Sequence, residues 1–223
     1  MNHSTIAAIS TAPGVGGIAV IRISGSEAIS LCQQLFQPKS KSIRFEEQAA
    51  NTVIFGSVVD DNGETIDDVL VSLFRAPHSF TGEDVVEISC HGSVFIQQQI
   101  LHLLIEKGCR LAMPGEFTQR AFLNGKMDLA QAEAVADLIA SGSAASHRMA
   151  MNQMRGGFSN ELTNLRTQLL DFVSLVELEL DFSEEDVEFA DRTRLKELAH
   201  EIETHISTLA DSFRVVNALK NGI

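Results

Sequence analysis

The chain has 223 residues, 44% of them hydrophobic, which is enough for two small domains that each bury a core. Its 30 acidic residues outnumber the 17 basic ones, and the net charge of −13 disfavours nucleic-acid binding by this chain alone, because such a surface repels phosphates. No apolar run reaches membrane-spanning length and the N-terminus lacks the pattern of a signal peptide, which predicts a cytoplasmic protein with no membrane contact.

The first half of the chain alternates between polar and apolar residues with a period of two, which is the pattern of half-buried strands. It predicts five strands, over residues 5–11, 17–24, 52–60, 65–74 and 84–91. The third and fourth strands form a hairpin, because the Asn62-Gly63 step between them tolerates the positive φ of a tight turn. Helices are predicted over residues 28–36, with Ser26 as N-cap, and over residues 94–107, followed by Gly108 as the C-terminal cap.

From about Thr118 the apolar spacing becomes helical and stays so to the end. Two long amphipathic helices are predicted on either side of an acidic turn, Glu177 to Asp191, which holds eight carboxylates and no basic residue. The helices form an antiparallel pair, and Gly156-Gly157 interrupts the first of them. The Asn221-Gly222 step is a helix stop, and a helical pair with no closing element suggests a fragment.

Motifs of several enzyme classes are absent from the sequence. The glycine run from Pro13 to Gly17 lies between two strands and fits neither GxxxxGK[ST] nor GxGxxG, so it predicts a tight turn. The histidines form no metal-binding pair, and Cys32, Cys90 and Cys109 are widely spaced, which predicts reduced core residues. No GxSxG elbow occurs. The sequence therefore predicts no catalytic residue and no metal ligand.

Three charged residues are candidates for binding, each with a plainer alternative. Arg22 shares a strand face with Ile18 and Val20, so it either faces a ligand or belongs to an internal salt bridge. Glu87 lies on a mixed strand face that solvation alone would explain. Lys126 follows a turn, where a lysine is ordinarily a surface residue. The residues by themselves leave these alternatives open.

The segment from Pro114 to Ile139, PGEFTQRAFLNGKMDLAQAEAVADLI, joins the two patterns. It opens with a Pro-Gly turn, sets Glu116, Arg120 and Lys126 among large apolar residues, and then enters an alanine-rich helix. Charges so close to apolar groups must be paired, solvated or directed at a ligand. By itself the segment is suited to a polar ligand at the edge of a core. Together with the resemblance described below, we interpret Glu116 and Arg120 as pairing or turn-fixing residues, and the segment as a hinge between two domains.

Four ordered segments resemble the bacterial tRNA-modification GTPases of the MnmE (TrmE) family. They are APGVGGIAVIRISG (residues 12–25), SFTGEDVVEISCHG (79–92), the segment from Pro114 to Ile139, and LELDFSEEDVEF (178–189). The resemblance implies an α+β protein whose N-terminal mixed α/β domain, residues 1–118, is similar to the folate-binding domain of glycine-cleavage aminomethyltransferases. Residues 119–223 would then be the first half of an all-α helical domain, ending where a G domain would begin.

The resemblance also implies a ligand and its contacts. The family's folate-binding positions fall on Arg22 of the IRISG strand, Glu87 of GEDVVE and Lys126 of FLNGKMDL. The implied cofactor is 5-formyltetrahydrofolate or a related reduced folate, whose pterin edge is rich in N–H donors and whose tail is anionic. We expect Glu87 to bind the pterin, with Arg22 and Lys126 nearer polar or anionic groups.

The implied parent protein is a GTP hydrolase that acts in tRNA modification. It would be a homodimer through its N-terminal domain and would work with a flavoprotein of the MnmG (GidA) type to modify the wobble uridine of tRNA. GTP, Mg²⁺ and K⁺ would be bound only by the G domain. This chain has no Walker lysine, so we do not expect it to hydrolyse GTP, and its acidic balance leaves tRNA mainly to the partner or to further parts.

Three functions therefore stay in competition. The leading one is a folate-binding and dimerisation module that does not turn over its ligand, since no general acid or base stands beside the expected one-carbon unit. The alternative is a free-standing folate-dependent enzyme similar to the aminomethyltransferases, which predicts turnover by this chain alone. A third is a passive dimerisation scaffold, which predicts no saturable binding of a reduced folate.

Overall fold

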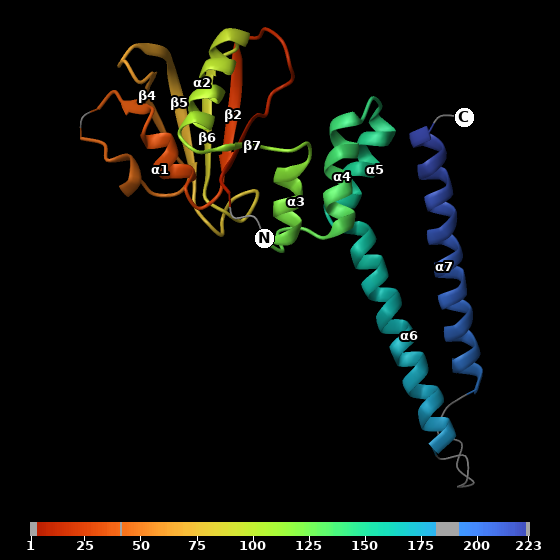
Figure 1. Cartoon of the computed structure of the whole chain (residues 1–223). Helices are drawn as coiled ribbons and strands as arrows, with labels where there is room; N and C mark the ends of the chain where they lie inside the picture. Colours follow the sequence, from red (N-terminus) through yellow and green to blue (C-terminus); the bar gives the residue numbers. More distant parts are fainter. Residues whose placement is uncertain (1–3, 41, 182–191, 222–223) are drawn as a thin grey trace. The chain divides into compact units, whose positions relative to one another are not determined.

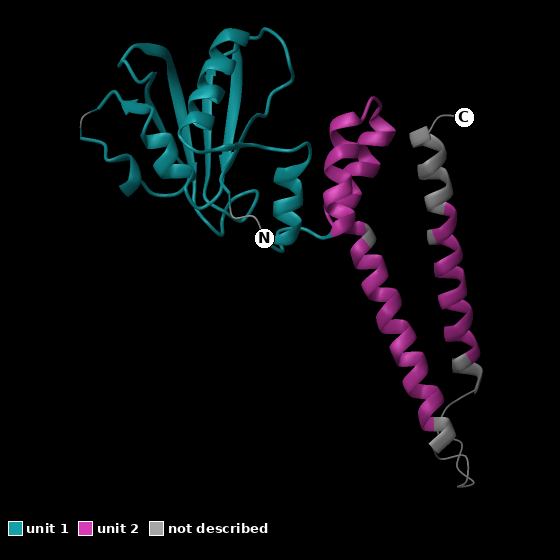
Figure 2. Cartoon of the chain, in the orientation of Figure 1, with its two compact units in different colours: residues 1–128 teal, residues 129–223 magenta. Residues whose placement is uncertain are grey.

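The computed structural model describes residues 4–40, 42–181 and 192–221. They form two compact units, residues 1–128 and 129–223 (Figures 1 and 2). The first unit combines a sheet with helices, and the regular elements in the described part of the second unit are all helices, so the predicted α+β class is confirmed. The sequence pattern places the boundary after residue 118, whereas the chain divides into its two compact units after residue 128. The reason is that Arg120 and Asn124 bind Glu83 and the Thr81 carbonyl of the first unit.

The sheet of the first unit has seven strands in the order β3-β4-β5-β6-β2-β1-β7. Neighbouring strands are antiparallel except for β1 and β7, which are parallel. The strands are β1 (Ile6–Ile9), β2 (Ile18–Ser24), β3 (Phe36–Pro38), β4 (Thr52–Val59), β5 (Thr65–Phe74), β6 (Val85–His91) and β7 (Arg110–Leu111). β4 and β5 form the predicted hairpin, and Gly63 in their turn has a φ of 82°.

Two helices cover one face of the sheet, and Figure 1 shows both of them on its near side. Alternate residues of the central strands, such as Ile21, Val71 and Ile88, are fully buried and form one apolar cluster with residues of these helices. The helices of the first unit are α1 (Ala28–Gln33), the 3₁₀ helix η1 (Phe45–Glu47), α2 (Val94–Glu106) and α3 (Glu116–Leu123). The two that cover the sheet are α1 and α2.

The prediction for α1 is wrong in its last three residues, 34–36. The helix ends at Gln33, because Phe36 begins β3, where it pairs with Val58 and is 3% exposed. Long-range pairing of a buried aromatic residue thus overrides the local helical pattern. The N-cap is Glu27 rather than Ser26. For α2, the predicted bounds are confirmed to within one residue.

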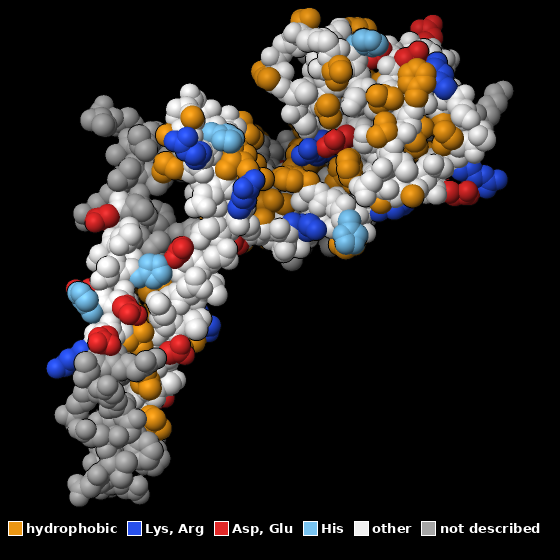
Figure 3. All heavy atoms as spheres, turned by 180° about the vertical axis from the view of Figure 1, so that it is seen from behind, with side chains coloured by type: hydrophobic (Ala, Val, Ile, Leu, Met, Phe, Trp, Pro, Cys, Tyr) orange, Lys and Arg blue, Asp and Glu red, His pale blue; other side chains and the backbone are white. Residues whose placement is uncertain are grey.

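Among the described residues of the first unit, the other face of the sheet is covered at one end. Ser24 is buried and bonds Glu83 and Thr81 of the segment between β5 and β6, each at 2.7 Å. Arg120 of α3 binds the same Glu83, so α3 and this segment lie over the end of the sheet that contains Ser24. Beyond it lies the open face, on which apolar side chains gather (Figure 3). The open face consists of Ile18, Val20 and Arg22 of β2, Val53, Phe55 and Ser57 of β4, Asp68, Leu70 and Ser72 of β5, and Glu87, Ser89 and His91 of β6.

The second unit contains α4 (Leu129–Ala140), α5 (Ala144–Met154), α6 (Gly157–Asp181) and α7 (Arg192–Asn221). The predicted interruption at Gly156-Gly157 is confirmed, since α5 ends before it and α6 begins at its second glycine. The predicted antiparallel pair is α6 and α7 (Figure 1), in which His205 Nε2 lies 2.8 Å from Glu161 Oε2. The acidic turn falls mostly on residues 182–191, and the helix stop includes Gly222; these positions lie outside the described residues.

Side chains that often carry chemistry are buried or dispersed. Cys32, Cys90 and Cys109 are buried and unpaired, which confirms the prediction of reduced core residues. Burial raises the pKa of Cys90 and of Cys109 to about 11, so both thiols are protonated near neutral pH. Over the described ranges, no group of His, Cys, Asp and Glu side chains is placed to hold a metal ion. None of the helices that the structure describes is long and apolar enough to cross a membrane.

Candidate functional site

Two of the three candidate residues, Arg22 and Glu87, are brought together on the open face. They are 65 positions apart in sequence but stand opposite each other on the neighbouring strands β2 and β6. Arg22 Nε donates to Glu87 Oε1 at 2.8 Å, and Arg22 Nη2 lies 2.7 Å from the same oxygen. The structure therefore contains the internal salt bridge that the sequence leaves open for Arg22.

The guanidinium of Arg22 lies beside two aromatic rings at the covered end of the sheet. Its central carbon is 5.2 Å from the ring centroid of Phe80 and 5.5 Å from that of Phe117. Cation–π attraction and the ion pair hold the guanidinium in one position. Phe80 comes from the segment between β5 and β6, and Phe117 from α3. Sequence reasoning did not select them as site residues, since both lie in turn-rich segments where no periodicity indicates their orientation.

The ion pair leaves hydrogen-bonding atoms available. Arg22 uses Nε and Nη2 on a single oxygen of Glu87, so in the part of the chain that the structure describes Glu87 Oε2 and Arg22 Nη1 have no hydrogen-bond partner. Both side chains are 25% exposed. A carboxylate oxygen accepts and a guanidinium nitrogen donates, so a ligand that carries a donor beside an acceptor fits this pair.

Lys126 does not contact the Arg22–Glu87 pair directly. Its Nζ donates to the carbonyl of Pro77 at 2.9 Å, and a Cβ at Gly82 would come within 3.3 Å of its aliphatic chain. Both partners belong to the segment that also carries Phe80. Lys126 is therefore exposed and packs against the segment between β5 and β6, which also supplies Phe80 to the site. Its hydrogen-bond acceptor there is a neutral carbonyl.

Glu116 and Arg120 form the buried ion-pair network that fixes α3. Glu116 binds Arg110, and Arg120 Nη2 donates to Glu116 Oε1 at 3.1 Å and to the Ser4 carbonyl at 2.8 Å. The bond from Arg110, with further bonds from the Met113 backbone and Arg120, lowers the pKa of Glu116 to about 2. The interpretation of both residues as pairing residues is confirmed. Their role is to position α3, and with it Phe117.

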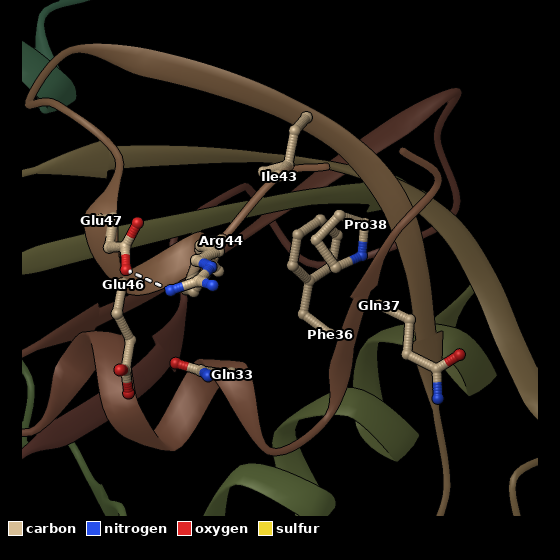
Figure 4. A pocket seen from close by; sticks show the side chains of 9 residues that line it. Gln33, Phe36, Gln37, Pro38, Ile43, Arg44, Glu46 and Glu47 are labelled. Carbon is tan, nitrogen blue, oxygen red and sulfur yellow. Dashed lines mark hydrogen bonds and ion pairs between the residues drawn. The ribbon is translucent and has the colours of Figure 1, made fainter. Parts of the chain in front are cut away.

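A separate hollow of about 520 Å³ lies against α1, β3 and η1 (Figure 4). Phe36 and Phe45 line it, with ring centroids 5.2 Å apart. Arg44 Nη1 donates to Glu47 Oε1 at 3.0 Å, so these two exposed charges at the hollow neutralise each other. None of the three candidate residues lines this hollow. The Arg22–Glu87 pair is therefore the candidate site.

The fold and the site define a class: an α+β domain with a partly exposed arginine–glutamate pair on its open sheet face, followed by an all-helical domain. Residues 5–126 match the family described as the GTP-binding protein TrmE N-terminus. Residues 129–223 match the MnmE helical domain. The chain belongs to the tRNA modification GTPase MnmE family, with its two matched regions corresponding to its two compact units.

Curated relatives agree over the whole chain. It is 65% identical to a protein named tRNA modification GTPase MnmE from Parabacteroides distasonis, over 99% of this chain and 48% of that protein. Proteins of the same name from Bacteroides thetaiotaomicron and Flavobacterium johnsoniae are 64% and 59% identical over the full chain. The chain spans about half the length of the curated relatives it matches.

Proposed function

We propose that this chain binds a reduced folate of the 5-formyltetrahydrofolate type, as the ligand-binding portion of a GTPase that modifies tRNA. The name shared by the relatives supports the tRNA-modifying role. The observation that carries the ligand is the Arg22–Glu87 pair, held beside Phe80 and Phe117 with an acceptor and a donor left over. We expect no GTP hydrolysis from these residues.

The residues present fit such a ligand. A pterin presents N–H donors next to a carbonyl acceptor, which Glu87 Oε2 and Arg22 Nη1 complement. Lys126 would face a polar oxygen at the same end of the ligand, exchanging the Pro77 carbonyl for it. A reduced folate supplies a one-carbon unit when bound. We assign to the side chains of this site the binding and orientation of the folate. We assign no chemical step of the tRNA modification to them.

The proposal extends to the assembly. We propose that the first unit forms a homodimer, because Val53 and Phe55 of β4 are 62% and 51% exposed and give an apolar surface to a second copy. The whole protein would act with a flavoprotein of the MnmG type on the wobble uridine of tRNA. A concentration-dependent mass by sedimentation equilibrium is the expected result for this chain, and a constant monomer mass would contradict the dimer.

Calorimetric titration with 5-formyltetrahydrofolate tests the ligand. We expect saturable binding by the chain, and an affinity lower by about tenfold or more in Glu87→Gln, because the amide replaces a charged acceptor. Arg22→Ala and Lys126→Ala should weaken binding as well. Glu47→Gln is the matched control, since Glu47 pairs with Arg44 at an exposed position away from the site.

Each competing function predicts its own outcome when the chain is mixed with 5-formyltetrahydrofolate, measured as binding or as release of the one-carbon unit. Unchanged affinity in Glu87→Gln contradicts the pterin contact, and unchanged affinity in both Arg22→Ala and Lys126→Ala contradicts the site. No saturable binding by the unaltered chain supports the passive scaffold. Release of the one-carbon unit by the chain alone supports an aminomethyltransferase-like enzyme.

A further inference from the structure

His91, at the end of β6, is held by a buried carboxylate. Asp67 is 8% exposed and accepts three hydrogen bonds: from the His91 backbone N–H at 2.7 Å, from the Asp68 backbone N–H at 2.9 Å, and from His91 Nδ1 at 2.7 Å. An ionised carboxylate only accepts, so Nδ1 carries the proton. The other ring nitrogen of the neutral imidazole, Nε2, is then an acceptor.

The ring is fixed although it is exposed. The side chain of His91 is 70% exposed, and its Nε2 has no partner among the residues that the structure describes. The carboxylate of Asp67 accepts from the backbone N–H groups of Asp68 and His91. These two bonds do not require the imidazole ring to contact Asp67 as well. Orienting an exposed side chain costs conformational entropy. A carboxylate that accepts from Nδ1 fixes the tautomer and the orientation of the ring, as it does in histidines that bind a metal ion through the other nitrogen.

His91 lies on the open face in line with the candidate site. Glu87, Ser89 and His91 are alternate residues of β6 and point to the same side. Glu87 stands beside Arg22, and Ser89 stands between Leu70 of β5 and Val20 of β2. Along β6 the open face therefore begins with the ion pair at Glu87, continues with apolar neighbours on both sides of Ser89, and ends with the polar imidazole of His91. Four residues of strand separate its two ends by about 13 Å.

We propose that His91 is a second contact of the same ligand, which lies along β6 with one polar end at Arg22 and Glu87 and the other at His91. The apolar stretch beside Leu70 and Val20 fits an aromatic spacer between the two ends. This inference rests on the proposed function. For a reduced folate the spacer is the p-aminobenzoyl group, and His91 Nε2 accepts a hydrogen bond from the amide N–H that joins it to glutamate. Asp67 is the positioning residue.

A comparison of two ligands isolates this contact. 5-Formyltetrahydropteroate has the pterin and the benzoyl group of 5-formyltetrahydrofolate but lacks the glutamate and its amide. In calorimetric titrations, His91→Ala should bind the folate about three- to tenfold more weakly and the pteroate unchanged, which is the range for one neutral hydrogen bond. His91→Gln offers a side-chain acceptor and should recover part of the loss. Asp67→Asn should resemble His91→Ala.

His102→Ala is the control, because His102 is an exposed histidine on α2 that pairs with Glu106 of the same helix. Equal weakening of both ligands in His91→Ala, or no weakening of either, overturns the proposal while leaving folate binding intact. Absence of binding of both ligands by the unaltered chain overturns the proposed function and this contact with it. Thermal unfolding followed by circular dichroism separates loss of binding from loss of fold. A His91→Gln variant that folds but binds the folate as weakly as His91→Ala also contradicts the acceptor role of His91.

Discussion

Glu116 is a carboxylate whose charge state is coupled to the fold. Its side chain is 10% exposed and binds Arg110 and Arg120, which are on β7 and α3. The bond from Arg110 comes first among the causes that lower its pKa from 4.5 to about 2. A carboxylate with a depressed folded-state pKa stabilises the fold fully above its unfolded pKa, and this contribution is lost as the pH falls through the folded pKa.

Replacement of Glu116 by Gln should therefore cost about 2–3 kcal/mol near neutral pH, since Arg110 loses its ion pair with Glu116 and Arg120 is left with Glu83. The difference from the unaltered chain should shrink between pH 4.5 and about 2, where Glu116 itself takes up a proton. Urea unfolding measures both effects. The chain has no Trp and no Tyr, so circular dichroism is the suitable signal.

Glu47→Gln is the control for Glu116, because the Arg44–Glu47 pair is 78% and 65% exposed and such pairs contribute little. Its unfolding curve should follow that of the unaltered chain at every pH. A Glu116→Gln variant with the same stability at neutral pH would contradict the role of the network. So would a stability difference that persists undiminished at the lowest pH.

At the scale of elements, the glycine-rich segment before β2 is fitted to the end of β6 by backbone contact. Gly16 N–H donates to the Gly92 carbonyl at 3.1 Å, and a Cβ at Gly92 would lie 2.3 Å from the Gly16 carbonyl oxygen. We expect Gly92→Ala to displace this segment and to destabilise the chain by about 1–3 kcal/mol. Gly17→Ala, where a Cβ meets nothing within 4 Å, should be close to neutral. Urea unfolding of both variants checks this, and equal stability would contradict the close contact.

The elements that local chemistry specifies could be predicted from the sequence, and those that depend on distant partners could not. The β4–β5 hairpin follows from Asn62-Gly63, and the break between α5 and α6 follows from Gly156-Gly157. β3 and β7 escaped prediction, because Phe36 and the Arg110–Leu111 pair are in strands only through contact with β4 and β1.

The same distinction holds for the candidate site. Arg22 shares a strand face with the apolar residues Ile18 and Val20, which the sequence shows, and its side chain is 25% exposed. Its pairing with Glu87 requires that β2 and β6 be neighbours, which spacing does not reveal. The hydrogen bond between His91 Nδ1 and Asp67 likewise requires that β5 lie beside β6. Resemblance favoured a binding role for the three candidate residues, but the contacts of Arg22 with Glu87 come from the topology.

At the scale of the whole molecule, the division into two compact units indicates which fragment of the chain should fold on its own. The segment after residue 118 contributes Arg120, which binds Glu83, Asn124, which binds the Thr81 carbonyl, and Lys126. All of their described partners lie in the first unit. A boundary drawn after residue 118 would therefore remove side chains that the first unit needs, although the helical pattern begins there.

A fragment of residues 1–128 should fold alone, unfold cooperatively in urea and bind 5-formyltetrahydrofolate as the full chain does. A fragment of residues 1–118 keeps Arg22 and Glu87 but loses Arg120, so Glu83 and Glu116 each lose a buried partner, and it should be less stable by about 3–5 kcal/mol. Equal stability of the two fragments would contradict the assignment of α3 to the first unit. Binding by the longer fragment alone would indicate that residues 119–128, which include most of α3 and Lys126, complete the site as well as the fold.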